Sequence, residues 1–263
     1  MSLINKLFNL KGRTAVITGA HGYLGKKICI TLAEMKANLI LVSRNKKKND
    51  AFIKKLTNNY PSIKIKGYIC DLSKEKSRNL LIKNINKNNI NILINNATYS
   101  NNLQGYADKF EKQSIKKWKE SFEINLTAAF HLIMGLSKNL KRSGNGTIIN
   151  VSSIYGVYAP DWNMYKGTKM GNAAAYSAAK GGLIQLTRWL STTLSPSVRV
   201  NSISPGGILR DQPKKFIYSY KRKTPLNRMA KEEDLIGAFA FLATDASNYI
   251  TGQNIIVDGG WGN

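Results

Sequence analysis

The chain has 263 residues and a formal net charge of +25, with 40 Lys and Arg against 15 Asp and Glu. This length can bury a substantial core and is compatible with one large α/β domain. No apolar run is long enough to cross a membrane, and the first ten residues lack the basic-then-apolar order of a secretory signal, so we expect neither membrane insertion nor export.

The positive charge would suit an anionic partner such as nucleic acid, an acidic membrane surface or a phosphorylated substrate. The lysines are scattered among asparagines, as in Lys46 to Asp50 and Asn84 to Asn91, and no nucleic-acid-binding motif accompanies them. We therefore expect a small-molecule substrate and no nucleic-acid or membrane partner. Cys29 and Cys70 lie in apolar segments without metal-ligand partners, which predicts buried reduced thiols, no metal site and a cytoplasmic protein.

Apolar, β-rich segments alternate with longer amphipathic segments along the whole chain. Strands are predicted at Thr14 to Thr18, Leu39 to Ser43, Ile63 to Cys70, Ile92 to Asn95, Gly146 to Ser152, Val198 to Ile203 and Asn254 to Val257. Helices are predicted at Leu24 to Met35, Lys47 to Asn58, Lys74 to Asn88, Ser114 to Lys141, Ala175 to Leu194 and Lys231 to Thr244. The alternation predicts one Rossmann-type domain over residues 1–263, an α/β fold whose doubly wound parallel sheet of about seven strands carries helices on both faces. Two stretches fit it poorly, Ile154 to Ala174 and the basic Gly206 to Arg228.

The first predicted strand leads directly into the run Thr18-Gly19-Ala20-His21-Gly22-Tyr23-Leu24-Gly25, and a helix pattern follows at once. Glycines allow a tight turn and a close approach of the backbone to a pyrophosphate, while the helix N-terminus offers free N–H groups and a positive dipole. The run favours dinucleotide binding over an ordinary strand-to-helix turn. The cofactor contacts expected here are Gly19, His21, Gly22, Tyr23 and Leu24.

The end of the second predicted strand bears on the choice of cofactor. An NAD-binding site often has a carboxylate there to bind the adenosine ribose, whereas this chain has Ser43 followed by Arg44. A guanidinium can make paired hydrogen bonds to a 2′-phosphate, so NADP(H) is favoured, with NAD(H) possible. Asp71 is either an acceptor for the adenine edge or, together with Ser73, a helix cap.

Tyr176 and Lys180 stand four residues apart in a predicted helix, which places a phenol and an ammonium on one face. An ammonium close to a phenol favours the phenolate and is expected to lower the tyrosine pKa from about 10 toward neutrality. Such a pair can transfer a proton to a carbonyl or from an alcohol. Exposed helices also carry this spacing by chance, so the pair alone does not establish a catalytic site.

Several further motifs occur in a fixed order. They are the turn with Gly19, Gly22 and Gly25, the run Asn95-Asn96-Ala97, Asn125 within Glu-Ile-Asn-Leu, Val151-Ser152-Ser153, Tyr176 with Lys180, Pro205-Gly206, and Thr251-Gly252-Gln253 leading to Asp258-Gly259-Gly260. In this order they resemble the short-chain dehydrogenase/reductase family over essentially the whole chain. The resemblance implies an NAD(P)-dependent oxidoreductase that interconverts a carbonyl and a secondary alcohol, as a homodimer or homotetramer.

The resemblance also implies roles for individual residues. Tyr176 is the general acid/base, Lys180 lowers its pKa and holds the nicotinamide ribose, and Ser153 hydrogen-bonds the reacting oxygen. Asn125 organises a proton-relay water, and Asn95 secures the sheet edge near the cofactor. The remaining cofactor contacts that it implies are Leu72, Ala97, Pro205, Gly206 and Ile208.

The chain departs from the family pattern at three single positions. Tyr23 stands where the family normally has a glycine, and Thr98 replaces the glycine that usually completes Asn-Asn-Ala-Gly. Arg210 takes the place of a threonine that often follows Pro205 by five residues, so the hydrogen bond of that threonine to the nicotinamide amide must come from elsewhere or be absent.

A second Tyr-x-x-x-Lys, formed by Tyr165 and Lys169, competes with the first. Tyr165 lies 12 residues after Ser153, close to the interval customary in the family, whereas Tyr176 lies 23 residues after it. Tyr176 is still favoured, because its surroundings form a helix pattern and those of Tyr165 contain several glycines. Residues 155–171 then contain an insertion of roughly ten residues over the substrate site.

The insertion, the positive charge and the glycine-turn variant favour a sugar, sugar phosphate or nucleotide sugar as substrate. The insertion and the run from Gly206 to Gln212 also resemble a bacterial subgroup associated with flagellin and surface-glycan modification. A 3-oxoacyl thioester reductase is the alternative enzyme, because an acidic phosphopantetheine carrier would suit a basic surface. A non-catalytic, cofactor-sensing binding protein is the alternative from another class.

Overall fold

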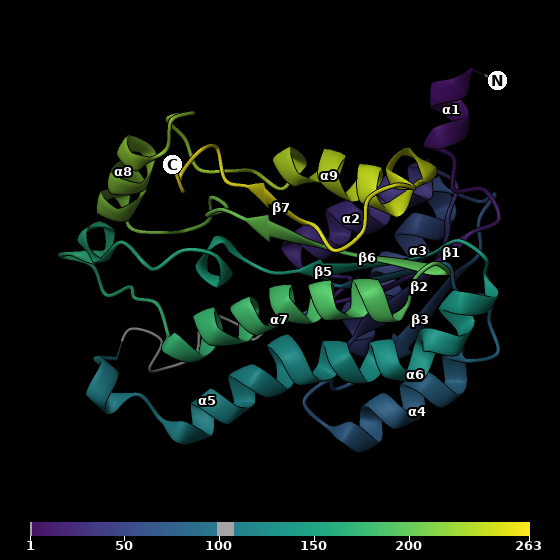
Figure 1. The fold of residues 1–263 in the computed structure, drawn as a ribbon, viewed down its shortest axis with the longest axis horizontal. Coiled ribbons are helices and arrows are strands. Elements are labelled where there is room, and N and C mark those ends of the chain that lie inside the picture. The colour runs from purple at the N-terminus through teal and green to yellow at the C-terminus, as the bar shows by residue number, and fades with distance from the viewer. Residues whose placement is uncertain (1, 99–107) are drawn as a thin grey trace.

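The computed structural model describes residues 2–98 and 108–263 (Figure 1). Within these ranges the strands form one parallel sheet of seven, in the order β3-β2-β1-β4-β5-β6-β7. They are β1 (Thr14–Thr18), β2 (Asn38–Ser43), β3 (Ile65–Ile69), β4 (Ile92–Asn95), β5 (Gly146–Val151), β6 (Val198–Pro205) and β7 (Asn254–Val257). The strand order reverses at β1, which has β2 on one side and β4 on the other. This is the doubly wound α/β fold predicted from the alternation, and its ligand crevice lies at the carboxyl ends of the strands around the reversal.

Helices cover both faces of the sheet (Figure 1). One face carries α2 (Tyr23–Glu34), α3 (Lys46–Asn59) and α9 (Glu233–Ala243). The other carries α4 (Glu75–Ile85), α6 (Ala128–Arg142) and α7 (Ala174–Thr193), with α5 (Ile115–Phe122) packed against α7. Two short helices, α1 (Leu3–Leu7) and α8 (Lys214–Lys223), lie away from the sheet.

The strands read as continuous apolar runs because both faces of the sheet are covered. In β1, Ala15 and Ile17 pack into the cluster under α2, α3 and α9, while Val16 between them packs into the cluster under α4, α6 and α7. Ile94 and Leu93 of β4 divide in the same way. The twofold alternation of strand side chains thus supplies two cores.

Two of the differences between the observed and the predicted elements lie close to the candidate site. The helix predicted from Ser114 to Lys141 is divided into α5 and α6 by a π-helical turn at Glu123–Thr127. The basic segment after Gly206 contains α8, which was not predicted. Cys29 and Cys70 are free and buried, as expected. Among residues 2–98 and 108–263, none of the helices combines the length and hydrophobicity that a membrane crossing needs.

Candidate active site

The glycine turn after β1 brings the chain into α2 with little side-chain bulk. Gly19 has a φ of +64°, which favours glycine, and a Cβ there would lie 3.0 Å from the Cα of Ala97. A Cβ on Gly25 would lie 2.1 Å from the carbonyl oxygen of Gly19. Among the described residues, α2 begins at Tyr23 with Gly22 as its N-cap, so no N-cap side chain bonds the first N–H groups of the helix. This turn fits the pyrophosphate of a dinucleotide.

The other two residues predicted in this turn differ in their surroundings. Leu24 is partly buried and packs against the core cluster under α2, α3 and α9, and its contact with a cofactor stays a prediction. His21 places its Nε2 atom in a buried position with no hydrogen-bond partner in the described part of the chain. A buried imidazole nitrogen without a partner is costly, so this atom is suited to accept or donate a bond when a ligand is present.

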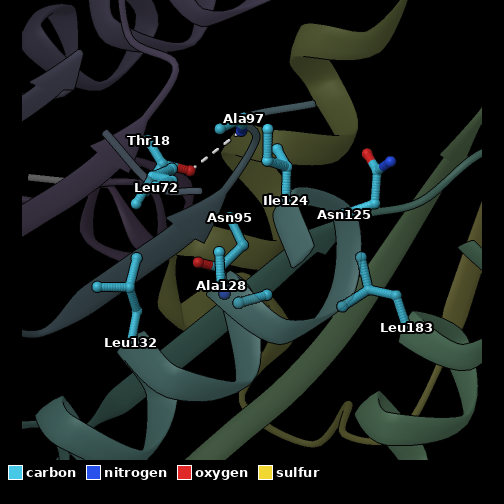
Figure 2. A pocket seen from close by; sticks show the side chains of 10 residues that line it. Thr18, Leu72, Asn95, Ala97, Ile124, Asn125, Ala128, Leu132 and Leu183 are labelled. Carbon is cyan, nitrogen blue, oxygen red and sulfur yellow. Dashed lines mark hydrogen bonds between the residues drawn. The ribbon is translucent and has the colours of Figure 1, made fainter. Parts of the chain in front are cut away.

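A small pocket lies at the carboxyl ends of β1 and β4 (Figure 2). Its lining consists of Thr18, Leu72, Asn95, Ala97, Ile124, Asn125, Ala128, Ala129, Leu132 and Leu183. Thr18 Oγ1 accepts hydrogen bonds from the backbone N–H groups of Asn96 and Ala97, each at 3.0 Å, which ties β1 to the segment after β4. Asn95 donates to Asn150 Oδ1 at 2.9 Å, while its own Oδ1 is buried with no partner among the described residues. Asn95 therefore joins β4 to β5. The pocket brings together four of the predicted site residues, Leu72, Asn95, Ala97 and Asn125.

The adenosine end of the crevice lies beyond β2 and β3. Ser43 is buried, and its hydroxyl accepts a hydrogen bond from the backbone N–H of Asn45 at 3.2 Å. Asp71 Oδ1 accepts from the backbone and the hydroxyl of Ser73, at 3.1 and 2.7 Å. The hydrogen bond from the Ser73 hydroxyl, helped by the charges of Lys74 and Arg44, lowers the pKa of Asp71. Asp71 thus stabilises its own turn. The exposed Arg44 lies close enough to Asp71 for its charge to lower the pKa of that carboxyl.

Asn125 lies in the π-helical turn between α5 and α6. Its amide Nδ2 donates to the carbonyl oxygen of Ser121 at 3.0 Å and to the Ser121 hydroxyl at 3.1 Å. Its Oδ1 accepts from the hydroxyl of Thr98 at 2.9 Å. Thr98, one of the departures from the family pattern, therefore holds the side chain of Asn125.

Arg78 on α4 holds this π-helical turn from the side. The arginine is 2% exposed, and its Nη1 atom donates both to the carbonyl oxygen of Leu72 and to Glu123, the first residue of the turn. Its Nε donates to Nδ1 of His131 on α6 at 2.9 Å. One buried side chain therefore joins the loop after β3 to the helix that carries Asn125.

We expect Arg78→Met to lower the free energy of unfolding by about 2 kcal/mol, because it leaves the Leu72 carbonyl oxygen and Glu123 without this donor. Urea denaturation followed by circular dichroism measures the change. Arg142→Met, on an exposed arginine at the end of α6, is the matched control and should shift the midpoint little. Equal midpoints for the two variants would contradict a structural role for Arg78.

Ser153, Tyr176 and Lys180 meet where β5 ends and α7 begins. Ser153 lies close enough to the Tyr176 hydroxyl to lower its pKa. Lys180 is 1% exposed, its Nζ donates to the carbonyl oxygen of Val151 at 2.7 Å, and it lies 5.7 Å from the centroid of the Tyr176 ring. Ser152 donates to the carbonyl oxygen of Lys180 at 2.8 Å and so anchors α7 to the strand. The geometry brings a phenol, a hydroxyl and an amine together, the groups that proton transfer at a carbonyl requires.

The electrostatics of this cluster differ from the prediction. Burial raises the pKa of Tyr176, and the hydrogen bond with Ser153 offsets part of the rise. Burial also lowers the pKa of Lys180 from 10.5 to about 7. The predicted lowering of the tyrosine pKa is therefore wrong for the protein by itself, because burial outweighs the effect of a lysine that is only partly charged near neutral pH. Tyr176 keeps its proton at neutral pH, which suits a proton donor.

The competing tyrosine, Tyr165, lies in a different environment. It belongs to an aromatic cluster whose buried members are Ile154, Met164, Tyr165, Phe216, Tyr220, Met229 and Trp261. Its ring packs against Phe216 of α8 with the centroids 5.3 Å apart, and its hydroxyl is bonded to that of Tyr155. Lys169 is exposed, and no helix connects it to Tyr165. The insertion therefore docks onto α8 through the aromatic cluster, and Tyr165 serves that packing.

The loop after β6 is fixed at both ends. The backbone N–H of Gly206 donates to Val257 at 2.9 Å, and that of Gly207 donates to the hydroxyl of Tyr220 at 2.6 Å. Ile208 pairs with Ala230 in an isolated parallel bridge. Pro205 is the last residue of β6, so Pro205, Gly206 and Ile208 all lie at the carboxyl end of the sheet, as predicted for residues near the nicotinamide.

The sequence analysis did not identify the residues that hold Asn125 and its helical turn in place. Thr98 and Arg78 hold Asn125 and its helix, but Thr98 was noted only as a departure from the family pattern, and Arg78 belongs to none of the motifs. An arginine among the apolar positions of α4 was the available signal, because Leu81 and Ile85 at its spacing are both buried.

Comparison with known proteins places the chain in a family. The family model described as enoyl-(acyl carrier protein) reductase matches residues 19–262. The chain is 33% identical to a 3-oxoacyl-[acyl-carrier-protein] reductase of Rickettsia conorii, an alignment covering 97% of this chain and 98% of the relative. It is 31% identical to a sorbose reductase of Candida albicans, with 97% and 89% covered. It is 29% identical to the post-translational flagellin modification protein A of Campylobacter coli, with 96% and 99% covered.

Solved structures show the same architecture. A short-chain dehydrogenase from Leptospira borgpetersenii with bound NAD⁺ superposes with a TM-score of 0.84 at 30% identity, covering 99% of this chain and 96% of that one. The RhlG/NADP active-site complex of Pseudomonas aeruginosa gives 0.85 at 26% identity, with 97% and 98% covered. The family model includes Ser153, Tyr176 and Lys180, and the two structures cover nearly the whole chain. The chain therefore belongs to the short-chain dehydrogenase/reductase family, whose members are NAD(P)-dependent oxidoreductases.

Proposed function

We propose that the protein is an NADP(H)-dependent oxidoreductase that interconverts a carbonyl and a secondary alcohol on a sugar, sugar phosphate or nucleotide sugar. The observation that carries the proposal is the cluster of Ser153, Tyr176 and the buried Lys180 at the carboxyl end of a Rossmann-type sheet. A bound nicotinamide would supply or accept the hydride. The residues of the chain then have to stabilise and protonate the oxygen.

In the reductive direction, Ser153 and Tyr176 both offer a hydroxyl to the substrate carbonyl oxygen. As the carbon gains a hydride, negative charge develops on that oxygen, and Tyr176 transfers its proton to it. The raised pKa of Tyr176 keeps the proton available until that moment. Lys180, with a pKa of about 7, can hold or release a proton beside the tyrosine at neutral pH, and Asn125 stands in the neighbouring helical turn.

The proposed preference for NADP(H) rests on Arg44. Its guanidinium is exposed just after β2, at the end of the crevice where the adenosine ribose would lie, and Ser43 leaves no carboxylate at the strand end. The charge of Arg44 interacts with the carboxylate of Asp71, and the Oδ1 atom of Asp71 accepts a hydrogen bond from the Ser73 hydroxyl. Related structures carry NADP or NAD⁺, so the charge at Arg44 is the feature that distinguishes the two in this chain.

We expect Arg44→Ala to weaken NADPH binding about tenfold or more and to leave NADH binding nearly unchanged, since only NADPH carries the 2′-phosphate. Titration of nicotinamide fluorescence measures both dissociation constants. Lys47→Ala is the control, because it removes one positive charge from the first turn of α3. It shows how much NADPH binding weakens when any nearby positive charge is lost. Tighter or equal binding of NADH by the unaltered protein would contradict the proposed preference.

The proposed substrate class rests on the insertion. Tyr155 lies near Tyr176, and the side chain of Trp162 is 57% exposed on the same segment. Aromatic faces and hydroxyls suit a polar ring with hydroxyl groups. The relatives include a sorbose reductase and a flagellin modification protein, and the latter supports a role in surface-glycan modification.

The second candidate is a 3-oxoacyl thioester reductase, favoured by the relative from Rickettsia conorii and by the family model. A screen by absorbance of reduced nicotinamide separates the two. Nucleotide sugars, ketoses and acetoacetyl thioesters would each be offered with both cofactors. If the protein turns over only the thioester, the second candidate replaces the sugar proposal. If it binds NADPH but oxidises or reduces none of these compounds, a cofactor-sensing role is favoured.

We also propose a homodimer or homotetramer, in one domain and in the cytoplasm. Phe130 and Met134 of α6 and Trp189 of α7 are 43, 57 and 58% exposed. Large apolar side chains gathered on neighbouring helices are typical of a subunit interface. Light scattering of the purified protein tests the assembly.

A further inference from the structure

Two of the residues that depart from the family pattern are in contact with each other. Tyr23, at the first position of α2, is 72% exposed. The guanidinium carbon of Arg210 lies 4.4 Å from the centroid of its ring. This distance is within the range of a cation–π interaction, which Arg makes readily because its guanidinium is flat and weakly hydrated. The tyrosine that replaces a glycine therefore holds the arginine that replaces a threonine.

The contact links two separate walls of the crevice. Tyr23 follows β1, Arg210 follows β6, and β4 and β5 lie between these strands in the sheet. Three strand spacings correspond to about 14 Å. The loop after β6 therefore reaches back toward the N-terminus of α2, where the glycine turn is shaped for a pyrophosphate.

The position of the guanidinium is held by further bonds. Arg210 forms an ion pair with Glu232, next to the start of α9, and its Nη1 donates to the carbonyl oxygen of Leu209 at 2.6 Å. Its backbone N–H donates to Gln212 Oε1, also at 2.6 Å. A guanidinium has five N–H donors, so these bonds fix the group and still leave donors for a ligand.

We propose that Arg210, positioned by Tyr23, binds the pyrophosphate of the dinucleotide. This inference rests on the proposed function, since it assumes that the crevice takes a dinucleotide. Arg210 adds a cation to the N–H groups and dipole of α2, and a phosphate is a better partner for a guanidinium than the neutral nicotinamide amide.

The strand order separates this arginine from Arg44. β2, which leads to Arg44, lies on one side of β1, whereas β6 lies on the other side beyond β4 and β5. Arg44 approaches the adenosine end and Arg210 the opposite side of the α2 N-terminus. The 2′-phosphate and the pyrophosphate therefore have different arginines, and the two can be tested independently.

The experiment compares NADPH and NADH, because both contain the pyrophosphate and only NADPH contains the 2′-phosphate. Dissociation constants come from nicotinamide fluorescence on the purified, full-length protein, with no turnover needed. Arg210→Ala should weaken both nucleotides by the same factor, about tenfold, as expected for the loss of one charge-assisted hydrogen bond. Arg44→Ala should weaken NADPH alone.

Two further variants separate charge from position. Tyr23→Ala frees the guanidinium and should weaken the binding of both nucleotides about threefold. Lys27→Ala removes one positive charge one turn further along α2, where Lys27 pairs with Glu233, and should change neither constant. Melting temperatures show that each variant is folded, and Arg210→Gln repeats the test with a side chain of similar length.

Equal weakening of NADPH and NADH by Arg210→Ala and Arg210→Gln, with Lys27→Ala unchanged, supports the assignment. Unchanged constants for both nucleotides would overturn it, and weakening of NADPH alone would overturn it by moving Arg210 to the 2′-phosphate. An unaltered protein that binds neither nucleotide would instead overturn the proposed function, and this outcome is distinct because no variant is needed to see it.

Discussion

Tyr176→Phe should lower kcat for carbonyl reduction by about 10² to 10⁴, the range typical of a lost general acid, while the dissociation constant for NADPH changes little. The hydroxyl that is removed is the one bonded to Ser153, and its raised pKa makes it a proton donor at neutral pH. Ser153 can still bond the substrate oxygen but has no comparable acidity. Steady-state absorbance with the best substrate of the screen gives kcat, and fluorescence titration gives the binding constant.

Tyr165→Phe is the matched control, because it removes the same atom from the competing tyrosine. Tyr165 is 8% exposed in the aromatic cluster, so the variant should lose the bond to Tyr155 and keep substantial turnover. A loss of turnover as large as that of Tyr176→Phe would show that the wrong tyrosine has been assigned.

Lys180→Met should reduce kcat by about 10² or more and should also change how stability depends on pH. Burial lowers the pKa of Lys180 to about 7, against 10.5 for an exposed lysine. Between these two pH values the unfolded lysine holds a proton that the folded one has released. Because the unfolded state binds more protons there, the free energy of unfolding of the unaltered protein should rise with pH, by at most about 1.4 kcal/mol per unit.

Urea denaturation at intervals from pH 6 to about pH 9.5 measures this slope, below the range in which tyrosines titrate. In Lys180→Met the rise should be smaller, whereas Lys169→Met, on the exposed lysine of the competing pair, should keep it. An identical slope in all three proteins would mean that Lys180 is not the titrating group. A free energy of unfolding that falls with pH over this range in the unaltered protein, but not in Lys180→Met, would contradict the direction of the Lys180 pKa shift.

The strands were predictable from sequence because both faces of the sheet are covered, which makes each strand a short apolar run. β1, β4 and β7 have the predicted limits, and β3 is shorter than predicted by two residues at its start and one at its end. The outer strand carries exposed residues such as Lys66, so its limits are set by pairing with β2 rather than by hydrophobicity. Local sequence does not encode that pairing.

The π-helical turn was not predicted from the sequence, and part of what holds it comes from distant parts of the chain. The run from Glu123 to Thr127 has ordinary helix-forming composition. Arg78 from α4 and Thr98 from the segment after β4 bond Glu123 and Asn125. These contacts join parts of the chain that only the fold brings together, and π turns of this kind often occur at functional sites.

Helix α8 was missed for a different reason. Pro213 lies immediately before the helix as its N-cap residue, a place where a proline is compatible with a helix start. Phe216 and Tyr220, four residues apart, are its buried side chains, and five lysines and arginines around them hide this apolar face. The apolar pair at helical spacing was the usable signal.

The identity of the candidate catalytic residues followed from helix-forming composition, since it favoured Tyr176 over Tyr165. The pKa of Tyr176 did not follow, because spacing along a helix gives the distance between two side chains but not their burial. Lys180 is 1% exposed, and desolvation outweighs the attraction that the pair would have in water.

The two ends of the chain tolerate additions very differently. Trp261 is 2% exposed, stacks on Tyr220 with the ring centroids 6.2 Å apart, and meets Tyr155 edge to face. A purification tag fused after Asn263 would begin two residues from this side chain and would press on the wall that carries the insertion. At the other end, α1 has no buried residue, so a tag placed there disturbs no packing.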